Sequence, residues 1–138
     1  MSRHHFIFLA LAVATVSAAC HRTPNAAERR QFAGRALKGT LAYPRSTLIG
    51  ISTGEDAAQI QLTSPDSATV VAEWFRYVLP LNKWVLEHDA VNRDGSIVIY
   101  AKQEDRPLWI TLTPNAGGPG STYTMVGVVV EGDSVRVR

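Results

Sequence analysis

One stretch of the chain has the pattern of an amphipathic helix, and it constrains the fold more than any other feature. Residues 64–79 read SPDSATVVAEWFRYVL and are followed by PLNKW. Apolar side chains recur there at the three- and four-residue spacing that places them on one stripe of a helix. The members of this stripe are Val70, Trp74, Tyr77, Val78 and Leu81. We therefore expect a helix that covers a hydrophobic core, with Trp74 at its buried centre.

Residues that start and stop helices predict both ends of this helix. Ser64 is expected to be the N-cap, because a serine hydroxyl can accept a hydrogen bond from an amide one turn on. Pro65 would then occupy the first helical position, where its missing N–H leaves nothing unpaired. Pro80 cannot donate to the carbonyl four residues back, so Leu79 is expected to be the last regular residue.

The segments around the helix alternate apolar and polar residues in the way that half-buried strands do. The expected strands are residues 47–53, 58–63, 84–91, 96–102, 107–113 and 122–130. Gly127 within the last of them indicates a bulge or a close backbone approach. The links after the helix are short, which favours antiparallel hairpins. We predict a single α+β domain over residues 41–138, with an antiparallel sheet of five to six strands (β-β-α-β-β-β-β) and one main helix packed on one face.

The first twenty residues have the composition of an export signal. Residues 1–5 are a short basic start, residues 6–16 form a run that is apolar apart from Thr15, and Ser17-Ala18-Ala19 are small. The run is too short to span a bilayer, which takes roughly 20 apolar residues, so residues 1–19 are interpreted as a secretory signal peptide. We therefore expect an exported protein.

Cys20, the only cysteine of the chain, directly follows these small residues. This arrangement resembles the modification site of bacterial lipoproteins, in which the cysteine receives a diacylglycerol and becomes the first mature residue. The resemblance implies lipidation of Cys20, with acyl chains such as palmitate, and a place on the periplasmic side of a bacterial membrane. Lipoproteins usually have leucine where this chain has Ser17, and small residues also suit ordinary cleavage. A soluble periplasmic or secreted protein is the alternative.

Residues 20–40 are expected to be a tether between the lipid anchor and the domain. From Arg22 to Arg45 six basic residues accompany one acid, whereas residues 46–138 carry seven basic and eleven acidic residues. The basic tether either contacts anionic headgroups or is simply solvated. Within it, residues 27–37 can form a short helix, although Gly34 disfavours one. The acidic domain lacks the basic patch of a nucleic-acid-binding protein, so no such partner is expected.

A group of uncharacterised exported bacterial proteins has a pattern that this chain resembles between about residues 41 and 113. The matching positions are Tyr43-Pro44, Asp66, Trp74-Phe75-Arg76, Leu79-Pro80 and Trp84. The group has Tyr-Pro-Gly-Ala, a helix ending Trp-Tyr-x-x-x-Leu-Pro-x-x-Gly-Trp, and a β meander. Here Arg45-Ser46 replaces Gly-Ala and Lys83 replaces the glycine, which implies a different helix exit with Asn82 in the left-handed conformation. The resemblance implies a fold and a location but no activity.

Few residues in the domain suit catalysis or metal binding. His88 is the only one of the four histidines that lies in it, between Glu87 and Asp89. A hydrolytic triad needs a histidine base, and a structural zinc site needs about four ligands. Glu87 and Asp89 are expected on one strand face, where they could act as acid and base. A small periplasmic hydrolase or ligand-modifying enzyme using these three residues is therefore the alternative to a non-enzymatic protein without cofactor or metal.

The second face of the sheet is the candidate binding surface, because a single helix can cover only one face. The residues expected toward the helix are Ile97, Ile99, Leu108, Ile110 and Leu112. Val98, Tyr100, Trp109, Tyr123 and Met125 would then line the other face, where aromatics beside threonines could stack on a sugar ring or accept an extended peptide. Alternatively, residues 27–37 fold over that face. The leading hypothesis is a membrane-anchored envelope domain that binds or scaffolds an envelope protein or polymer through this surface.

Overall fold

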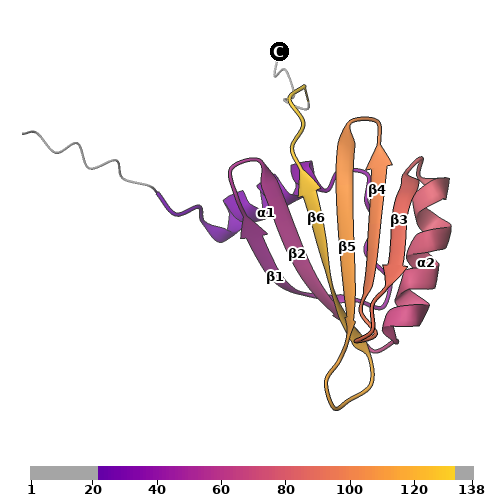
Figure 1. Ribbon diagram of the computed structural model, residues 1–138. Coiled ribbons are helices and arrows are strands. Elements are labelled where there is room, and N and C mark those ends of the chain that lie inside the picture. Colours follow the sequence, from indigo (N-terminus) through magenta and orange to yellow (C-terminus); the bar gives the residue numbers. More distant parts are fainter. Residues whose placement is uncertain (1–21, 133–138) are drawn as a thin grey trace, which may run out of the picture.

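The computed structural model describes residues 22–132, which form one six-stranded antiparallel sheet and two helices (Figure 1). The elements are α1 (Ala26–Ala36), β1 (Thr47–Thr53), β2 (Ala57–Ser64), α2 (Ala68–Leu81), β3 (Val85–Val91), β4 (Ile97–Gln103), β5 (Arg106–Pro114) and β6 (Ser121–Val128). This architecture confirms the predicted α+β class. The signal peptide expected at residues 1–19 and the lipidation expected at Cys20 lie outside the described residues.

The strands lie in the order β1-β2-β6-β5-β4-β3, and each neighbouring pair is antiparallel. Strands β3 to β6 form a meander, because short turns join them. Helix α2 carries the chain from β2 across to β3, which is one edge of the sheet (Figure 1). β1 is the other edge.

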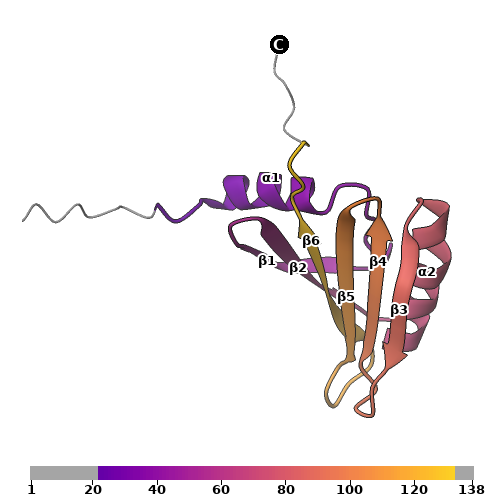
Figure 2. The ribbon, with the colours of Figure 1, turned by 45° about the horizontal axis from the view of Figure 1, so that its top comes forward.

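Both helices lie on the same face of the sheet (Figure 2). Tyr123 of β6 packs edge-on against Phe75 of α2, with 5.5 Å between the ring centroids. Gly127 lies four residues further along β6 and so points to the same face. A Cβ atom on Gly127 would lie 2.2 Å from the carbonyl oxygen of Ala36, so α1 passes over this glycine. The close backbone approach expected at Gly127 is therefore confirmed, and it is the contact with α1.

Helix α1 forms inside the segment predicted to be a tether. Asn25 caps it with a side chain that accepts a hydrogen bond from the amide of Glu28, whose carboxylate accepts one from the amide of Asn25. The helix contacts β1, β2 and β6, with Ala33 and Ala36 buried against the sheet. Small side chains allow this close approach, so α1 belongs to the folded unit, and no helix of residues 22–132 covers the other face of the sheet.

The buried side of α2 differs from the predicted stripe. The residues that it buries are Ala68, Val71, Ala72, Phe75 and Leu79. Of the predicted stripe, Val70, Tyr77 and Leu81 are exposed, while Trp74 and Val78 are half-buried at the margin of the core. The prediction was wrong by one position, or about 100° around the helix. Large apolar residues stand side by side at 70–71 and 74–75, so two neighbouring stripes have helical spacing.

The ends of α2 also differ from the prediction. Ser67 is the N-cap and accepts from the amide of Val70, while Ser64 accepts from the amide of Asp66 in the turn before the helix. The helix runs through Pro80 to Leu81, because the missing N–H falls in the last turn, where one lost hydrogen bond is tolerated.

Lys83 has a φ of 65°, so it, and not Asn82 with a φ of −99°, takes the left-handed conformation. The lysine thus adopts the conformation for which glycine is best suited.

The main core lies between α2 and the sheet. Its most buried large side chains are Val71, Phe75, Ile99, Leu108, Ile110, Leu112, Tyr123 and Met125. A second, smaller cluster under α1 contains Ala33, Ala36 and Ala58, with Phe32 and Val129 packed against it. Both clusters consist of residues between 32 and 129, so the described part of the chain carries its own core.

Phe75→Ala is expected to lower the free energy of unfolding by about 3–5 kcal/mol, because it removes the side chain at the centre of the contact between α2 and the sheet. Tyr77→Ala, on the exposed side of the same helix, is the matched control and should change stability by about 0.5 kcal/mol or less. Urea unfolding followed by circular dichroism measures both. Equal losses of stability in the two variants would contradict the finding that α2 buries Phe75 and exposes Tyr77.

Lys83→Gly is expected to raise the free energy of unfolding by about 0.5–1 kcal/mol, because relief of the left-handed strain exceeds the entropy that glycine loses on folding. Asn82→Gly is the control. It should lower stability, since Asn82 has a negative φ and its side-chain amide donates to the carbonyl of Val78 at 2.9 Å. Thermal unfolding of both variants provides the comparison. If Asn82→Gly raised the stability and Lys83→Gly lowered it, Asn82 and not Lys83 would be the residue in the left-handed conformation.

Candidate functional site

The sheet face opposite the helices, here called the open face, is crossed by a continuous row of side chains. The strand register places one residue from each strand in this row: Ser52, Gln59, Val126, Trp109, Tyr100 and His88. Both helices of residues 22–132 lie on the other face, so no described helix covers the row. The surface that remains is a face six strands wide.

Tyr100 and Trp109 form an aromatic platform near the middle of this row. Their ring centroids are 5.1 Å apart and the ring planes are tilted by 32°. Trp109 is 39% exposed although it lies in a central strand, and Tyr100 is half-buried. Val98, two residues before Tyr100, lies on the same face. The structure thus brings three of the five predicted face residues together.

Tyr123 does not join them, and its assignment to the open face was wrong. Tyr123 and Met125 are each 1% exposed and belong to the core beneath α2. Strand β6 has threonine or valine on one side and tyrosine or methionine on the other, so hydrophobicity alone does not determine which side is buried. The Tyr123 hydroxyl accepts from the amide of Tyr43 at 3.0 Å and lies 2.6 Å from the Ser46 hydroxyl. Burial raises the pKa of this phenol.

Uncharged polar side chains lie along one side of the aromatic platform. In the next row, Gln61, Thr124 and Thr111 lie on adjacent strands, and Thr122 and Thr113 are paired beyond them. These hydroxyl and amide groups can both donate and accept hydrogen bonds. Charged groups occur toward the β3 edge, where Lys102 lies 3.9 Å from Glu87. The open face therefore combines a flat apolar patch with neutral hydrogen-bonding groups.

The three residues of the enzymatic alternative are not brought together. A bulge between Leu86 and His88 shifts the strand register, so Asp89 points to the helix side while His88 lies opposite Tyr100 on the open face. Asp89 accepts two hydrogen bonds from Arg76 of α2, at 2.5 and 2.9 Å, and Glu87 faces Lys102. The expectation that Glu87 and Asp89 share a face was wrong, because the bulge breaks the two-residue alternation.

The Arg76 guanidinium keeps the carboxyl of Asp89 ionised, since its hydrogen bonds lower the pKa of that carboxyl. A carboxyl with a lowered pKa is a poor proton donor or acceptor near neutral pH. Its contact joins α2 to β3 and so has a structural role.

The tyrosine, tryptophans and aspartate of the Tyr-Pro…Trp pattern have structural roles. The Tyr43 hydroxyl donates to Asp66 at 2.6 Å, and its ring packs edge-on against Trp74. The indole of Trp84 donates to the carbonyl of Gly39 at 3.0 Å. Arg45 forms an ion pair with Asp66 at 3.0 Å. These contacts fix the segment between α1 and β1 against α2 and the residues on either side of it.

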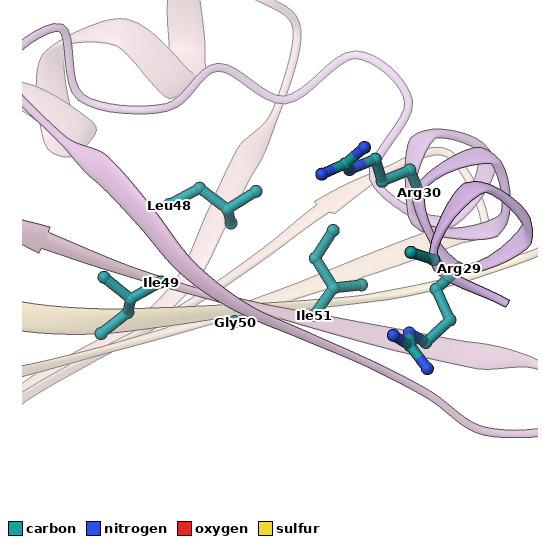
Figure 3. A pocket seen from close by; sticks show the side chains of 7 residues that line it. Arg29, Arg30, Leu48, Ile49, Gly50 and Ile51 are labelled. Atoms are coloured by element: carbon teal, nitrogen blue, oxygen red, sulfur yellow. The ribbon is translucent and has the colours of Figure 1, made fainter.

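A second surface feature is a groove of about 240 Å³ between α1 and β1, which the sequence pattern did not predict (Figure 3). Arg29 and Arg30 of α1 line it, together with Leu48, Ile49 and Ile51 of β1. Leu48 and Ile49 are 47% and 54% exposed. Among residues 22–132, Arg30 has no ion-pair partner. The available signal was an apolar Leu-Ile pair in an edge strand of a chain whose preceding segment is basic.

No family model, curated protein or solved structure matches this chain. Neither helix of residues 22–132 combines the length and apolar character that spanning a membrane requires. Within the same residues, no three His, Cys, Asp or Glu side chains gather in a way that could hold a metal ion. What the protein binds therefore has to follow from the chemistry of its own surfaces.

Asp89→Asn is expected to lower stability at pH 7 by about 1 kcal/mol or less, because the ion pair is partly exposed. The folded-state pKa of Asp89 lies below its unfolded value, so its stabilising effect is present above pH about 4 and is lost as the pH falls through the folded-state pKa. The difference between the native chain and the variant should therefore shrink in acid. Urea unfolding between pH 2 and 7 measures it.

Glu87→Gln is the matched control, since its partner Lys102 is 3.9 Å away and both side chains are more than 40% exposed. Its effect should be close to zero at every pH. A stability difference for Asp89→Asn that stays constant between pH 2 and 7 would contradict the role given to Arg76.

Proposed function

We propose that this protein is a lipid-anchored envelope protein on the periplasmic side of a bacterial membrane, and that it binds an envelope glycan through the open face without catalysing a reaction. The anchor part rests on the apolar leader and on Cys20 directly after it. The binding part rests on one observation, the Tyr100–Trp109 platform with its partly exposed indole and the neutral polar side chains beside it.

The chemistry of the open face favours a carbohydrate polymer. Sugar rings have apolar faces that pack on aromatic rings, and their hydroxyls pair with threonine and glutamine side chains such as Thr111 and Gln61. The row from Ser52 to His88 crosses five strand spacings, or about 24 Å, which is enough for several linked sugar units. The face carries few charges, so recognition would rest on stacking and neutral hydrogen bonds.

The enzymatic alternative has less support. His88 lies beside the platform on the open face, but its expected partners Glu87 and Asp89 bind Lys102 and Arg76 instead. A histidine without an orienting partner is a weak catalytic base. We therefore assign His88 to the rim of the binding surface.

Trp109→Ala and Tyr100→Ala are each expected to weaken binding to peptidoglycan sacculi about tenfold or more, because each removes half of the stacking platform. Co-sedimentation of the chain that begins at residue 22 with purified sacculi measures this. Tyr77→Ala removes an exposed aromatic side chain from the outer side of α2 and should leave binding unchanged. Equal binding by all three variants, or capture of a specific envelope protein and no glycan, would contradict glycan recognition.

Cys20→Ser is expected to abolish incorporation of labelled palmitate and to block processing of the full-length precursor, because the thiol is the acceptor of the lipid. Globomycin treatment of cells that make the native chain should cause the same accumulation of precursor. Electrophoresis of labelled cells measures both. Normal maturation of Cys20→Ser would show that the leader is an ordinary signal peptide and would reject the anchor.

A further inference from the structure

We propose that the groove between α1 and β1 docks on anionic phospholipid, so that the β1 edge of the sheet rests on the membrane surface. The docking surface consists of Arg29, Arg30, Leu48, Ile49 and Ile51, which line the groove in Figure 3. This inference adds an orientation to the proposed anchoring, but the docking itself does not require the lipid on Cys20.

Charge complementarity is the first argument for a lipid occupant. Three other basic residues, Arg22, Arg35 and Lys38, lie in or next to α1, and Glu28 is the only acid between Arg22 and Arg45. Glu28 is already engaged in the helix cap. A cluster of basic residues close to a membrane attracts anionic headgroups, with a gain of about fivefold in affinity for each charge. The guanidinium of Arg30 suits phosphate because it can donate two parallel hydrogen bonds.

The apolar side chains beside these arginines are the second argument. Leu48 and Ile49 are about half exposed, and the groove continues into a more apolar hollow of about 320 Å³ above Ile60 and Met125. An edge strand with exposed aliphatic residues would promote unwanted pairing if it faced water. Arginines next to aliphatic side chains match the boundary between headgroups and acyl chains, where both kinds of group are solvated.

The length of chain before α1 is the third argument. Only five residues separate Cys20 from the start of α1 at Ala26. Fully extended, this segment spans about 20 Å, so lipidation of Cys20 would hold α1 within that distance of the bilayer. The platform at Trp109 lies three strand spacings from β1, or about 14 Å further along the sheet. The open face would then extend away from the membrane toward the periplasmic polymer.

The test uses the chain that begins at residue 22, which carries its own core, and large unilamellar vesicles of phosphatidylcholine with or without 30% phosphatidylglycerol. We expect flotation with the anionic vesicles at low salt, little binding to pure phosphatidylcholine, and release in 0.5 M NaCl, where charges are screened. The double variant Arg29→Glu/Arg30→Glu should bind at least about 25-fold more weakly.

Arg93→Glu is the control, because it reverses one charge, half of the change in the double variant, in the turn between β3 and β4 at the opposite edge of the sheet. It should weaken binding by less than about fivefold. A loss per charge equal to that of the double variant would show a response to net charge alone and would overturn the docking surface. The absence of flotation with anionic vesicles at low salt would overturn it as well.

A fluorescent probe locates the contact directly. The chain from residue 22 has no cysteine, so Ile49→Cys and Arg93→Cys can each carry one NBD label. When anionic vesicles are added, the fluorescence of NBD at position 49 should rise and that of NBD at position 93 should stay constant. The opposite pattern would overturn the proposal, as would a dimer that Ile49→Ser converts to a monomer, since the groove would then belong to a second copy.

Failure of the proposed function and failure of this inference are distinguishable. Trp109→Ala should keep full vesicle binding while losing sacculus binding, and Arg29→Glu/Arg30→Glu should do the reverse. Loss of vesicle binding in Trp109→Ala, with its fold intact, would place the lipid contact on the open face and overturn the docking surface.

Discussion

The contact between Phe75 and Tyr123 determines which face of the sheet is covered. The two rings meet edge-on in the core, and Trp74 and Tyr43 extend the aromatic contacts outward from Phe75 to the segment before β1. The buried hydroxyl of Tyr123 receives a hydrogen bond from the backbone of that same segment. A buried phenol without a partner is unfavourable, so this hydrogen bond fixes Tyr123 toward the helices and directs its neighbours in β6 to the other face.

The two helices achieve one-sided coverage by different means. Helix α2 buries large side chains, whereas α1 brings alanines against Ala58 and passes directly over Gly127. The surfaces outside the core then differ in chemistry. The open face is neutral and aromatic, and the edge at β1 is basic and aliphatic. Binding of a polymer by one and of lipid by the other would use two separate parts of a small fold.

The sequence predicted the sheet well where alternation was unambiguous. In β4 and β5, isoleucine and leucine alternate with Val98, Tyr100 and Trp109, and the face on which each residue lies was predicted correctly. Alternation did not identify the buried side of β6, because threonine and tyrosine are both acceptable on either side. In β3 it gave the wrong face for Asp89, because a bulge moves this residue to the face opposite Glu87. The buried side of α2 was predicted wrongly, because large apolar residues at adjacent positions give two stripes that both have helical spacing. The groove beside α1 depends on packing between segments distant in sequence, which a linear pattern does not contain.

The central claim is that the helices share one face and leave the other open, and cysteine reactivity along β5 tests it most directly. In the chain from residue 22, which has no other cysteine, single cysteines at positions 109, 111 and 113 should react rapidly with a maleimide in the folded state. Cysteines at positions 108, 110 and 112, each 0% exposed in the native chain, should react only on unfolding. Protection at all six positions in the folded monomer would mean that the open face is covered and would contradict the account.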